Sequence, residues 1–252
     1  MFDQSPFQCR MEWGARGARE AAERGDIIIV VDVLSFSTTV VTAIHHGAII
    51  YPYPAYKDGK EFEFANRVGA ELIFGRAESV KLGNPTLSPV TFNQTHKHQK
   101  YVLCSLNGAL CSWVAAKVPA LLIGSLLNPS AVAAYANKLQ AQTGGDITVI
   151  SCGEQWEDVF NKENNLRPAI EDYLGAGAIL SKLIGEKSPE AELCASAFKS
   201  VGERVQDLIW DCGSGRELRL KGFGKDVLHA TQIDAFKNVP ILTDSYFIDA
   251  EV

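Results

Sequence analysis

The sequence contains no long apolar run, and this absence bears on where the protein works. No apolar stretch approaches the roughly 18 residues that a membrane-spanning helix needs. The N-terminal stretch MFDQSPFQCRMEWG lacks the basic start and the apolar centre of a signal peptide. The 252 residues are 46% apolar and 21% charged, which is typical of a globular protein with a sizeable core. We therefore expect a cytoplasmic protein that does not act in a membrane.

Two further absences exclude whole classes of function. The six cysteines form no Cys-x-x-Cys pair and no spacing typical of zinc, so we expect reduced, buried thiols such as Cys104 and Cys152. Lysine and arginine form no cluster and the net charge is −6, which argues against a nucleic-acid-binding surface. No glycine fingerprint of a dinucleotide site follows the first apolar run. An anionic ligand would therefore need local donors or a metal ion.

What the sequence does contain is an alternation of strand-like and helix-like segments. Apolar runs that begin near Ile27, Lys100 and Asp146 lead through short polar turns towards segments with helical periodicity. Strands that are apolar throughout indicate a largely parallel or mixed sheet, covered by helices on both faces. Further on, SPEAELCASAFKSVGERVQDLIWDC predicts one long helix or a helix pair, and VPILTDSYFID predicts a final short strand. No linker divides the chain, so we expect residues 1–252 to form one compact α/β unit, either undivided or made of two intertwined lobes.

Polar residues follow each of the three apolar runs. In open α/β sheets, ligands bind outside the carboxyl ends of the strands, so three parallel strands would bring these residues to a common crevice. They are Asp32, Ser35, Ser37 and Thr38; Ser105, Asn107 and Gly108; and Cys152, Gly153 and Glu154. Hydroxyls and helix N-termini favour an anion, and a glycine lets a backbone approach closely. The alternative is that Ser37 and its neighbours only cap a helix.

Asp32 poses a separate question, because a carboxylate at an anion site repels the ligand. A buried carboxylate needs a partner, and a metal ion, an arginine or backbone N–H groups would each meet that need. Mg²⁺ between Asp32 and a phosphate would do so with the oxygen ligands that it prefers. Glu171 and Asp172 are further acids in the helical segment PAIEDYLGAGAIL. Adjacent helical residues point about 100° apart, so either one of the pair faces the core or both are solvated acids in a first helical turn.

Three arginines are candidates for binding an anion. Arg216 lies in CGSGRELRLKGFGKDV, after a glycine-rich turn that also contains Ser214 and before Asp226. Arg76 follows a strand-like run, and Arg167 precedes the segment with the two acids. A guanidinium group can bind phosphate through two parallel hydrogen bonds. For each, the alternative is an exposed surface arginine.

Several segments together resemble the 2-phosphosulfolactate phosphatase family. They are, in order, VVDVLSFSTTV, LSPVTF, LCSLNGA, CGEQW, LRPAIEDYLGAGAI and SGRELRLKGFGKDV, within a region from about Asp26 to Pro240. The resemblance implies a three-layer α/β/α fold. It also implies Mg²⁺-dependent hydrolysis of the phosphate monoester of a small anionic hydroxy acid, as in the coenzyme M pathway.

The resemblance also implies roles for individual residues. Asp32 matches the family's acid after the first strand, Ser37 and Thr38 match its hydroxyls, and Asn107 and Gly108 match its Asn-Gly turn. Glu171 and Asp172 match the acidic pair, Ser214, Gly215 and Arg216 match the late glycine-rich turn, and Asp226 matches the acid after it. Ser88 with Pro89 is the best match to a Gly-Asn-Ser-Pro motif. The better-known members have an arginine where this chain has Ser35 and Phe36, and a Gly-Glu-Arg turn near Arg76.

These observations lead to a hypothesis of phosphoryl transfer to water assisted by Mg²⁺. The predicted metal ligands are Asp32, Glu171, Asp172 and Asp226. Asp32, Glu154 as a base and Arg216 as a charge-offsetting group are the predicted catalytic residues. The predicted substrate-binding residues are Ser35, Ser37, Thr38, Arg76, Ser88, Asn107, Gly108, Ser214 and Gly215.

Two alternative functions stand beside this hypothesis, and the sequence also leads to an expected oligomeric state. A non-catalytic protein that binds phosphorylated acids would retain the same fold without the chemistry. A phosphocysteine mechanism is disfavoured, because no Cys-x5-Arg loop is present. The expected partner is a small phosphorylated acid, and a homodimer is the expected assembly because closed symmetric dimers are the commonest oligomers.

Overall fold

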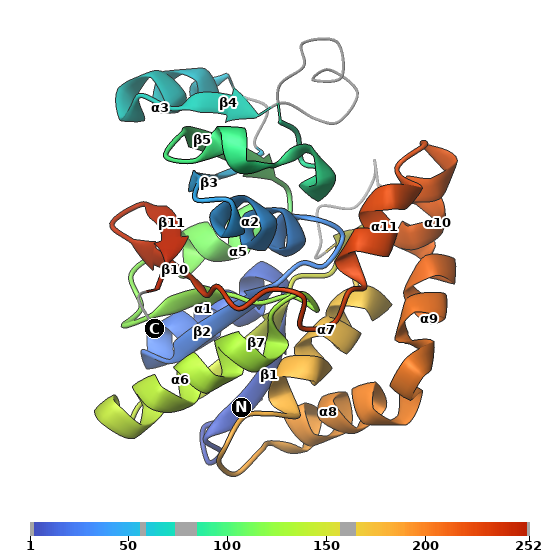
Figure 1. Cartoon of the computed structure of the whole chain (residues 1–252). Coiled ribbons are helices and arrows are strands. Elements are labelled where there is room, and N and C mark those ends of the chain that lie inside the picture. The colour runs from blue at the N-terminus through green and yellow to red at the C-terminus, as the bar shows by residue number, and fades with distance from the viewer. Residues whose placement is uncertain (1–2, 56–58, 74–84, 157–164, 251–252) are drawn as a thin grey trace.

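The described residues form a nine-stranded mixed sheet flanked by helices. The computed structural model of the chain describes all residues except 1–2, 56–58, 74–84, 157–164 and 251–252. The strand order is β1-β7-β2-β6-β10-β11-β3-β5-β4, and a separate two-stranded ribbon consists of β8 and β9. Figure 1 shows the strands as two groups, one above the other, with helices around both.

The first group of strands is parallel throughout. It consists of β1 (Cys9–Trp13), β7 (Ile147–Ser151), β2 (Ile27–Val31) and β6 (Leu121–Ile123). All five residues of β2 are buried, because one face of the strand packs in one core and the other face in a second core. Ile27, Ile29 and Val31 lie in the first core, whereas Ile28 and Val30 lie in the second. Burial on both faces explains why this strand shows no alternation of polar and apolar residues.

The second group is also parallel, and an antiparallel hairpin joins it to the first. The second group consists of β3 (Ile49–Pro54), β5 (Lys100–Ser105) and β4 (Glu71–Ile73). In the hairpin, β10 (Pro240–Thr243) pairs with β6 and β11 (Tyr246–Asp249) pairs with β3. The prediction of one final strand was therefore wrong. Only two residues separate the hairpin strands, and the first of them, Asp244, has a φ of 57° that suits a tight turn.

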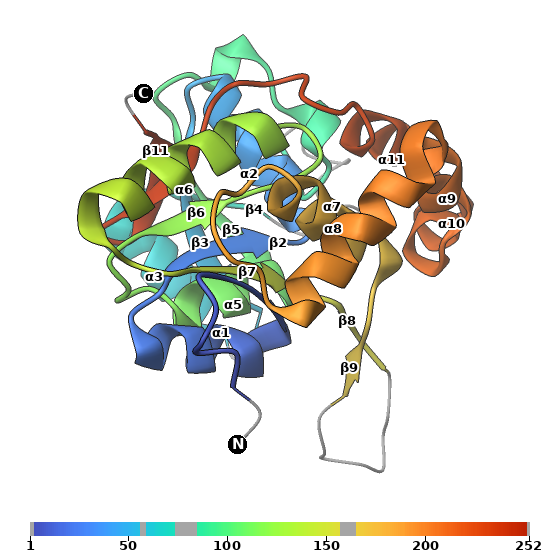
Figure 2. The same cartoon turned by 90° about the horizontal axis from the view of Figure 1, so that it is seen from below.

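Helices cover both faces of the sheet, which confirms the predicted three-layer α/β/α arrangement. Figure 2 shows α1 and α5 on one side of the strands and α6, α7 and α8 on the other. Their bounds are Gly14–Arg24, Gly108–Val114, Pro129–Thr143, Ile170–Leu180 and Pro189–Val201. The sequence analysis did not identify β1 or α1. In α1 the buried face consists of Gly14, Gly17, Ala18 and Ala21, small residues that give a weak apolar signal.

The remaining helices complete the two groups. Next to the strands lie α2 (Phe36–His45) and α3 (Lys60–Val68). The long C-terminal helical segment is a pair, in which α8 and α9 (Val205–Asp211) are separated by a 3₁₀ turn at Gly202–Arg204. Two further helices follow, α10 (Gly213–Leu220) and α11 (Gly224–Ala230), and they pack on each other at the right of Figure 1. Among the described helices, none combines the length and the apolar character of a membrane-spanning segment.

The second core contains residues of both strand groups. Ile28 and Val30 of β2 share it with Leu103 of β5 and with Phe36 of α2. This shared core brings the carboxyl end of β5 close to that of β2, although three antiparallel pairings separate the two groups in the sheet.

Candidate active site

The turn after β2 is held by its own hydroxyl groups. Ser37 Oγ accepts a hydrogen bond from the backbone N–H of Asp32 (2.8 Å) and donates to the carbonyl of Val30 (3.2 Å). Thr38 Oγ1 donates to the carbonyl of Val33 (2.7 Å), and both side chains are fully buried. Ser35, which precedes α2, is also buried. In this structure the hydroxyl groups of Ser37 and Thr38 donate to the backbone of the turn, and their predicted role in phosphate binding stays a prediction.

The Asp32 carboxylate joins this turn to the start of α5. Its Oδ1 accepts from the N–H of Phe36 (3.1 Å), and its Oδ2 accepts from the N–H of Gly108 (2.9 Å). A Cβ atom on Gly108 would lie 2.3 Å from the Phe36 ring and 2.8 Å from Asp32 Oδ2. Glycine is therefore required at this close approach, as the Asn-Gly turn predicted.

Asp172 makes a second clamp of the same kind. Its Oδ1 accepts from the N–H of Val33 (2.7 Å) and its Oδ2 accepts from the N–H of Gly153 (2.8 Å), so it joins the turns after β2 and β7. Both members of the acidic pair are buried, since Glu171 is 2% exposed and Asp172 is 3% exposed. Glu171 Oε2 accepts from the thiol of Cys212 (3.3 Å) at the start of α10. Because both acids are buried, neither predicted alternative holds: the acids are not solvated, and it is not only one of them that is buried.

Glu154 completes the group of acids at the carboxyl ends of the strands. It begins the two-stranded ribbon of β8 (Glu154–Gln155) and β9 (Leu166–Arg167). Its Oε2 accepts from Asn107 Nδ2 (3.0 Å), which links the turn after β7 to the turn after β5. The turns after β2, β5 and β7 therefore meet, as predicted. The reason differs from the one expected, because β5 belongs to the other strand group and comes close through the shared core.

Asp32, Glu154, Glu171 and Asp172, hereafter the acid cluster, act on one another electrostatically. Burial raises the pKa of Glu154 to about 8, and the charges of Asp32 and Glu171 add to this rise. Burial likewise raises the pKa of Asp172 well above its usual range, with further contributions from the same two acids. Buried like charges of this kind need protons or a cation to neutralise them.

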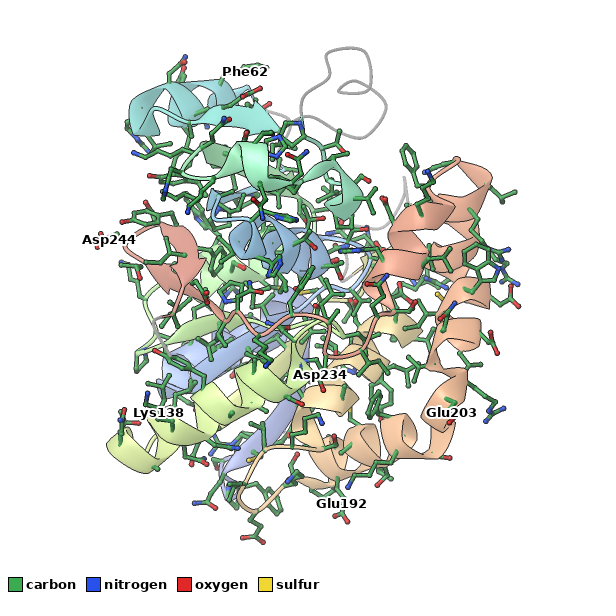
Figure 3. All side chains as sticks on the ribbon, in the orientation of Figure 1. Phe62, Lys138, Glu192, Glu203, Asp234 and Asp244 are labelled. Carbon is green, nitrogen blue, oxygen red and sulfur yellow. The ribbon has the colours of Figure 1, made fainter. Side chains whose placement is uncertain are left out.

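The acid cluster differs from the general distribution of charge in the molecule. Figure 3 shows Lys138, Glu192 and Glu203 projecting outwards from the peripheral helices, and all three are exposed. Charged side chains normally lie at the surface because burial removes their hydration. Buried carboxylates with raised pKa values are typical of functional sites.

The donor chemistry of the acid cluster suits a hard cation. Its side chains offer carboxylate oxygens, which are the ligands that Mg²⁺ prefers. Within the part of the chain that the structure describes, no three His, Cys, Asp or Glu side chains are arranged to hold one ion by themselves. One or two carboxylates, with water or substrate oxygens in the other positions, would match the usual coordination of Mg²⁺.

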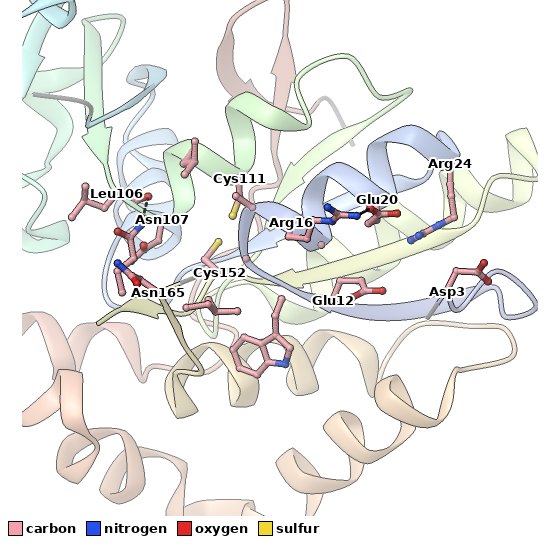
Figure 4. Close-up of a pocket in the computed structure, with 17 residues that line it drawn as sticks. Asp3, Glu12, Arg16, Glu20, Arg24, Leu106, Asn107, Cys111, Cys152 and Asn165 are labelled. Carbon is pink, nitrogen blue, oxygen red and sulfur yellow. Dashed lines mark hydrogen bonds and ion pairs between the residues drawn. The ribbon is translucent and has the colours of Figure 1, made fainter. Parts of the chain in front are cut away.

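A cavity of about 700 Å³ adjoins the acid cluster. Figure 4 shows Asn107, Cys111, Cys152 and Asn165 towards one end and Asp3 and Arg24 towards the other. None of the four acids lines it, and the cavity reaches the site at Asn107, the partner of Glu154, and at Cys152. Burial raises the pKa of the Cys152 thiol well above its usual range, with contributions from Cys111 and Asp32. A protonated, buried thiol is a poor nucleophile, which agrees with the rejection of a phosphocysteine mechanism.

Comparison with known proteins identifies the family. A sequence model described as 2-phosphosulpholactate phosphatase matches residues 16–245. The chain belongs to the 2-phosphosulpholactate phosphatase family. This membership confirms the resemblance in the sequence and makes the chain a member of a family of phosphoric monoester hydrolases.

Relatives in this family come from bacteria and from an archaeon. A probable 2-phosphosulfolactate phosphatase of Thermotoga maritima is 29% identical over 233 residues, which cover 87% of this chain and 90% of that protein. One of Carboxydothermus hydrogenoformans is 28% identical over 223 residues, or 84% of each chain. The 2-phosphosulfolactate phosphatase of Methanocaldococcus jannaschii is 26% identical over 212 residues, or 82% of this chain and 84% of that protein.

Two residues carried over from the family, Ser88 and Asp226, contact each other. Asp226 Oδ1 accepts from Ser88 Oγ (2.5 Å), and both residues are buried where α11 packs on the 3₁₀ turn Pro89–Thr91. The roles predicted for Asp226 as a metal ligand and for Ser88 as a substrate-binding residue stay predictions.

The late glycine-rich turn of the family motif forms the start of α10. Ser214 and Gly215 are buried, and a Cβ on Gly215 would lie 2.0 Å from the carbonyl oxygen of Ile209. Gly215 thus serves close packing of α10 on α9 rather than a loop that wraps a ligand. Arg216 is exposed on α10. Arg76 lies outside the described residues.

Arg167 lies beside Glu154, although the sequence did not place it among the predicted substrate-binding residues. It was recognised only as one of three candidate arginines, but its Cα lies directly opposite that of Glu154 in the β8–β9 ribbon. Its Nη2 would lie 2.5 Å from a Cβ on Gly213, so the guanidinium group packs against the start of α10. Its position beside Glu154 depends on pairing between two-residue strands, for which the sequence carries no clear signal.

Proposed function

We propose that this protein is a Mg²⁺-dependent phosphatase that hydrolyses the phosphate monoester of a small anionic hydroxy acid such as 2-phosphosulfolactate. The observation that carries the proposal is the acid cluster, four carboxylates of which two have raised pKa values, in a member of this family. A buried group of acids is costly unless a cation or protons neutralise it. A protein can tolerate the destabilisation by buried acids when the cation that neutralises them also serves catalysis.

Within this proposal the acids have separate tasks. Asp32 and Glu171 hold the metal ion, and Asp172 holds the turns after β2 and β7 in place through the N–H groups of Val33 and Gly153. When bound, Mg²⁺ would supply Lewis-acid polarisation of a phosphoryl oxygen. Asp32 also fixes the start of α5 through the N–H of Gly108, so its position is set by the backbone on two sides.

Glu154 is the residue proposed to accept a proton from the attacking water. Its pKa of about 8 lies near neutral pH, where a general base works best. Asn107 donates to Oε2 of the carboxylate and thereby orients it. Arg216 on α10, together with Arg76, offsets the negative charge of the transferring group.

The proposal includes two properties carried over from the sequence analysis. The enzyme acts in the cytoplasm, and it acts as a homodimer. Light scattering of the purified protein and fractionation of the source cells test these two properties separately from the chemistry.

The test of the proposed function is phosphate release from a panel of phosphorylated acids. The panel contains 2-phosphosulfolactate, 2-phospholactate and an uncharged alkyl phosphate, each assayed with excess Mg²⁺ and with EDTA. We expect release from the acids only when Mg²⁺ is present. Binding of the same acids without release under any metal condition would overturn the enzyme proposal in favour of a non-catalytic phosphate-binding protein.

A further inference from the structure

Arg167 projects from the same two-stranded ribbon that carries Glu154. The two residues are Cα partners in the antiparallel pairing of β8 with β9. Side chains of directly opposed residues in such a pair lie on the same face of the ribbon. Arg167 therefore extends from the face that carries the proposed base.

The guanidinium group of Arg167 is held in place without an acidic partner. It lies over the Trp156 ring, with 5.3 Å from Cζ to the ring centroid, and it packs against Gly213, where a side chain would collide with it. Among the described residues no carboxylate pairs with it, and none accepts a hydrogen bond from it. Stacking on an aromatic ring orients the planar group, while its five N–H donors still require acceptors.

Three other described arginines differ in this respect, whereas the exposed Arg67 stacks on Phe64 (5.1 Å from Cζ to the ring centroid) without an acidic partner among the described residues. Arg10 pairs with Asp26 (2.9 Å), and Arg24 pairs with the same aspartate (2.9 Å). Arg219 is the closest counterpart, since its Cζ lies 4.5 Å from the Trp210 ring centroid, but it also pairs with Asp211 (2.8 Å). Arg167 has the stacking of Arg219 without the ion pair.

The place of this guanidinium group indicates what it binds. Gly213 directly follows Cys212, whose thiol contacts Glu171, so the group lies beside the acid cluster. A partly buried guanidinium group with no acidic partner among the described residues has its donors available for an external oxyanion.

We propose that Arg167 binds the second oxyanion of the substrate, its carboxylate or sulfonate, and so selects phosphorylated acids over phosphate monoesters with no second charge. This inference rests on the proposed function and adds a substrate-selecting residue to it. It also gives a physical reason why a chain with Ser35 and Phe36 in place of a family arginine can still recognise a doubly anionic substrate.

The experiment compares two substrates that differ only in the second anion, 2-phospholactate and isopropyl phosphate. For Arg167→Gln we expect kcat/KM on 2-phospholactate to fall roughly 10–100-fold, mainly through KM, since a charged hydrogen-bond pair is lost. The same variant should leave kcat/KM on isopropyl phosphate within about twofold, because that substrate has no group for Arg167 to bind. Arg219→Gln is the matched control, and it should change neither substrate, because its Trp210 stack lies with Asp211 on the exposed side of α9 and α10.

The outcomes separate this inference from the proposed function. An equal fall on both substrates, or no change on either, would overturn the assignment of Arg167. If the wild-type protein releases phosphate from no acid of the panel, the proposed function fails, and calorimetric binding of 2-phospholactate still tests Arg167. Binding that is roughly 10–100-fold weaker in Arg167→Gln supports the assignment, and equal binding overturns it.

Discussion

The two ends of strand β2 carry buried aspartates in opposite electrostatic settings. Asp26 precedes the strand and is 3% exposed; it accepts from Arg10 (2.9 Å), from Arg24 (2.9 Å) and from Thr148 Oγ1 (2.6 Å). At the other end, Asp32 (6% exposed) and Asp172 (3% exposed) accept backbone N–H groups and lie among further acids. The same strand thus connects an aspartate that two arginines neutralise to a group of acids in which Asp32 and Glu171 raise the pKa of Asp172.

This difference shows how buried charges that serve stability can be distinguished from buried charges that serve function. At the Asp26 end, the chain itself provides the positive charges, so the cluster needs nothing from outside and serves stability. At the Asp172 end, neighbouring carboxylates raise its pKa, and no described basic side chain pairs with it. A cluster of that kind destabilises the protein until a cation or protons bind, which is reasonable only if the bound cation is useful.

The largest expected effect is on turnover when the acid cluster is changed. Asp32→Asn should lower Mg²⁺-dependent phosphate release by about 10³-fold, because a metal-binding carboxylate is lost. Its stability should fall by about 1–3 kcal/mol, because the amide keeps an acceptor oxygen for only one of the two N–H groups and leaves the other without an acceptor. Steady-state phosphate release and thermal melting measure the two effects. A variant with a tenth or more of wild-type activity would contradict the role of Asp32.

The compensated end should respond in the opposite way. Asp26→Asn leaves the buried Arg10 with less neutralising charge, so we expect a loss of about 3 kcal/mol in the free energy of unfolding. The kcat of the folded protein should stay within about twofold of wild type, since Asp26 lies at the other end of the strand from the acid cluster. Urea denaturation and phosphate release check the pair of expectations. If Asp26→Asn had unchanged stability and reduced activity, Asp26 would not serve stability in the way proposed, and the two ends of β2 would not differ in function.

A smaller effect is expected from a methyl group at the contact between the strand groups. Gly108→Ala places a Cβ 2.3 Å from the Phe36 ring, so we expect a loss of about 1–3 kcal/mol and weaker turnover as α5 shifts away from Asp32. Gly224→Ala is the control, because its Cβ would meet its nearest neighbour at 3.4 Å, an ordinary contact. Denaturation curves of both variants measure these losses of stability. Equal stabilities of Gly108→Ala and Gly224→Ala would contradict the expectation, because they would mean that the residues around Gly108 move to accommodate the methyl group.

The last expected effect concerns the dependence of stability on pH in the absence of metal. The pKa of Glu154 is about 8 in the folded protein against its ordinary value of 4.5, so between these values the folded state binds more protons than the unfolded state. The contribution of this group is fully present below about pH 4.5 and is lost as the pH rises through about 8. Melting temperatures measured with EDTA should therefore decline over this range.

Two controls sharpen this expectation. Excess Mg²⁺ should reduce the decline, because a cation bound only by the folded state neutralises the deprotonated acids. Glu154→Gln should flatten the profile measured with EDTA, because the titrating group is removed. A profile that is level from pH about 4.5 to about 8 in the metal-free wild type would contradict the electrostatic description of the acid cluster.

Much of the fold could be predicted because its signals are local. The apolar run of β2, the helix that follows it and the start and end of α6 at Pro129 and Gly144 all depend on residues near one another in the chain. The hairpin β10–β11 was missed as a pair, since two short strands joined by two residues resemble one strand. The middle position of this hairpin in the sheet depends on partners more than a hundred residues away.

The site was predictable to a similar degree. Residues after strands were expected to meet, and Asp32, Gly108 and Glu154 do so, with Asp172 of α7 beside them. Ser37 and Asp226 were predicted at the ligand because they match a motif, and in this structure each also binds a protein group. The polarity of a side chain reveals that it needs a partner but not which partner it finds.

The sequence by itself determined the elements of this protein, because the pattern of apolar residues decides which faces of strands and helices are buried. It also determined which carboxylates stand at the strand ends. Only the tertiary structure decided which of those carboxylates are neutralised. Arg10 reaches Asp26 through the adjacent packing of β1, β7 and β2, whereas the acid cluster forms where α5, α7 and the β8–β9 ribbon meet. Charge compensation depends on distances between residues far apart in sequence, and folding sets those distances.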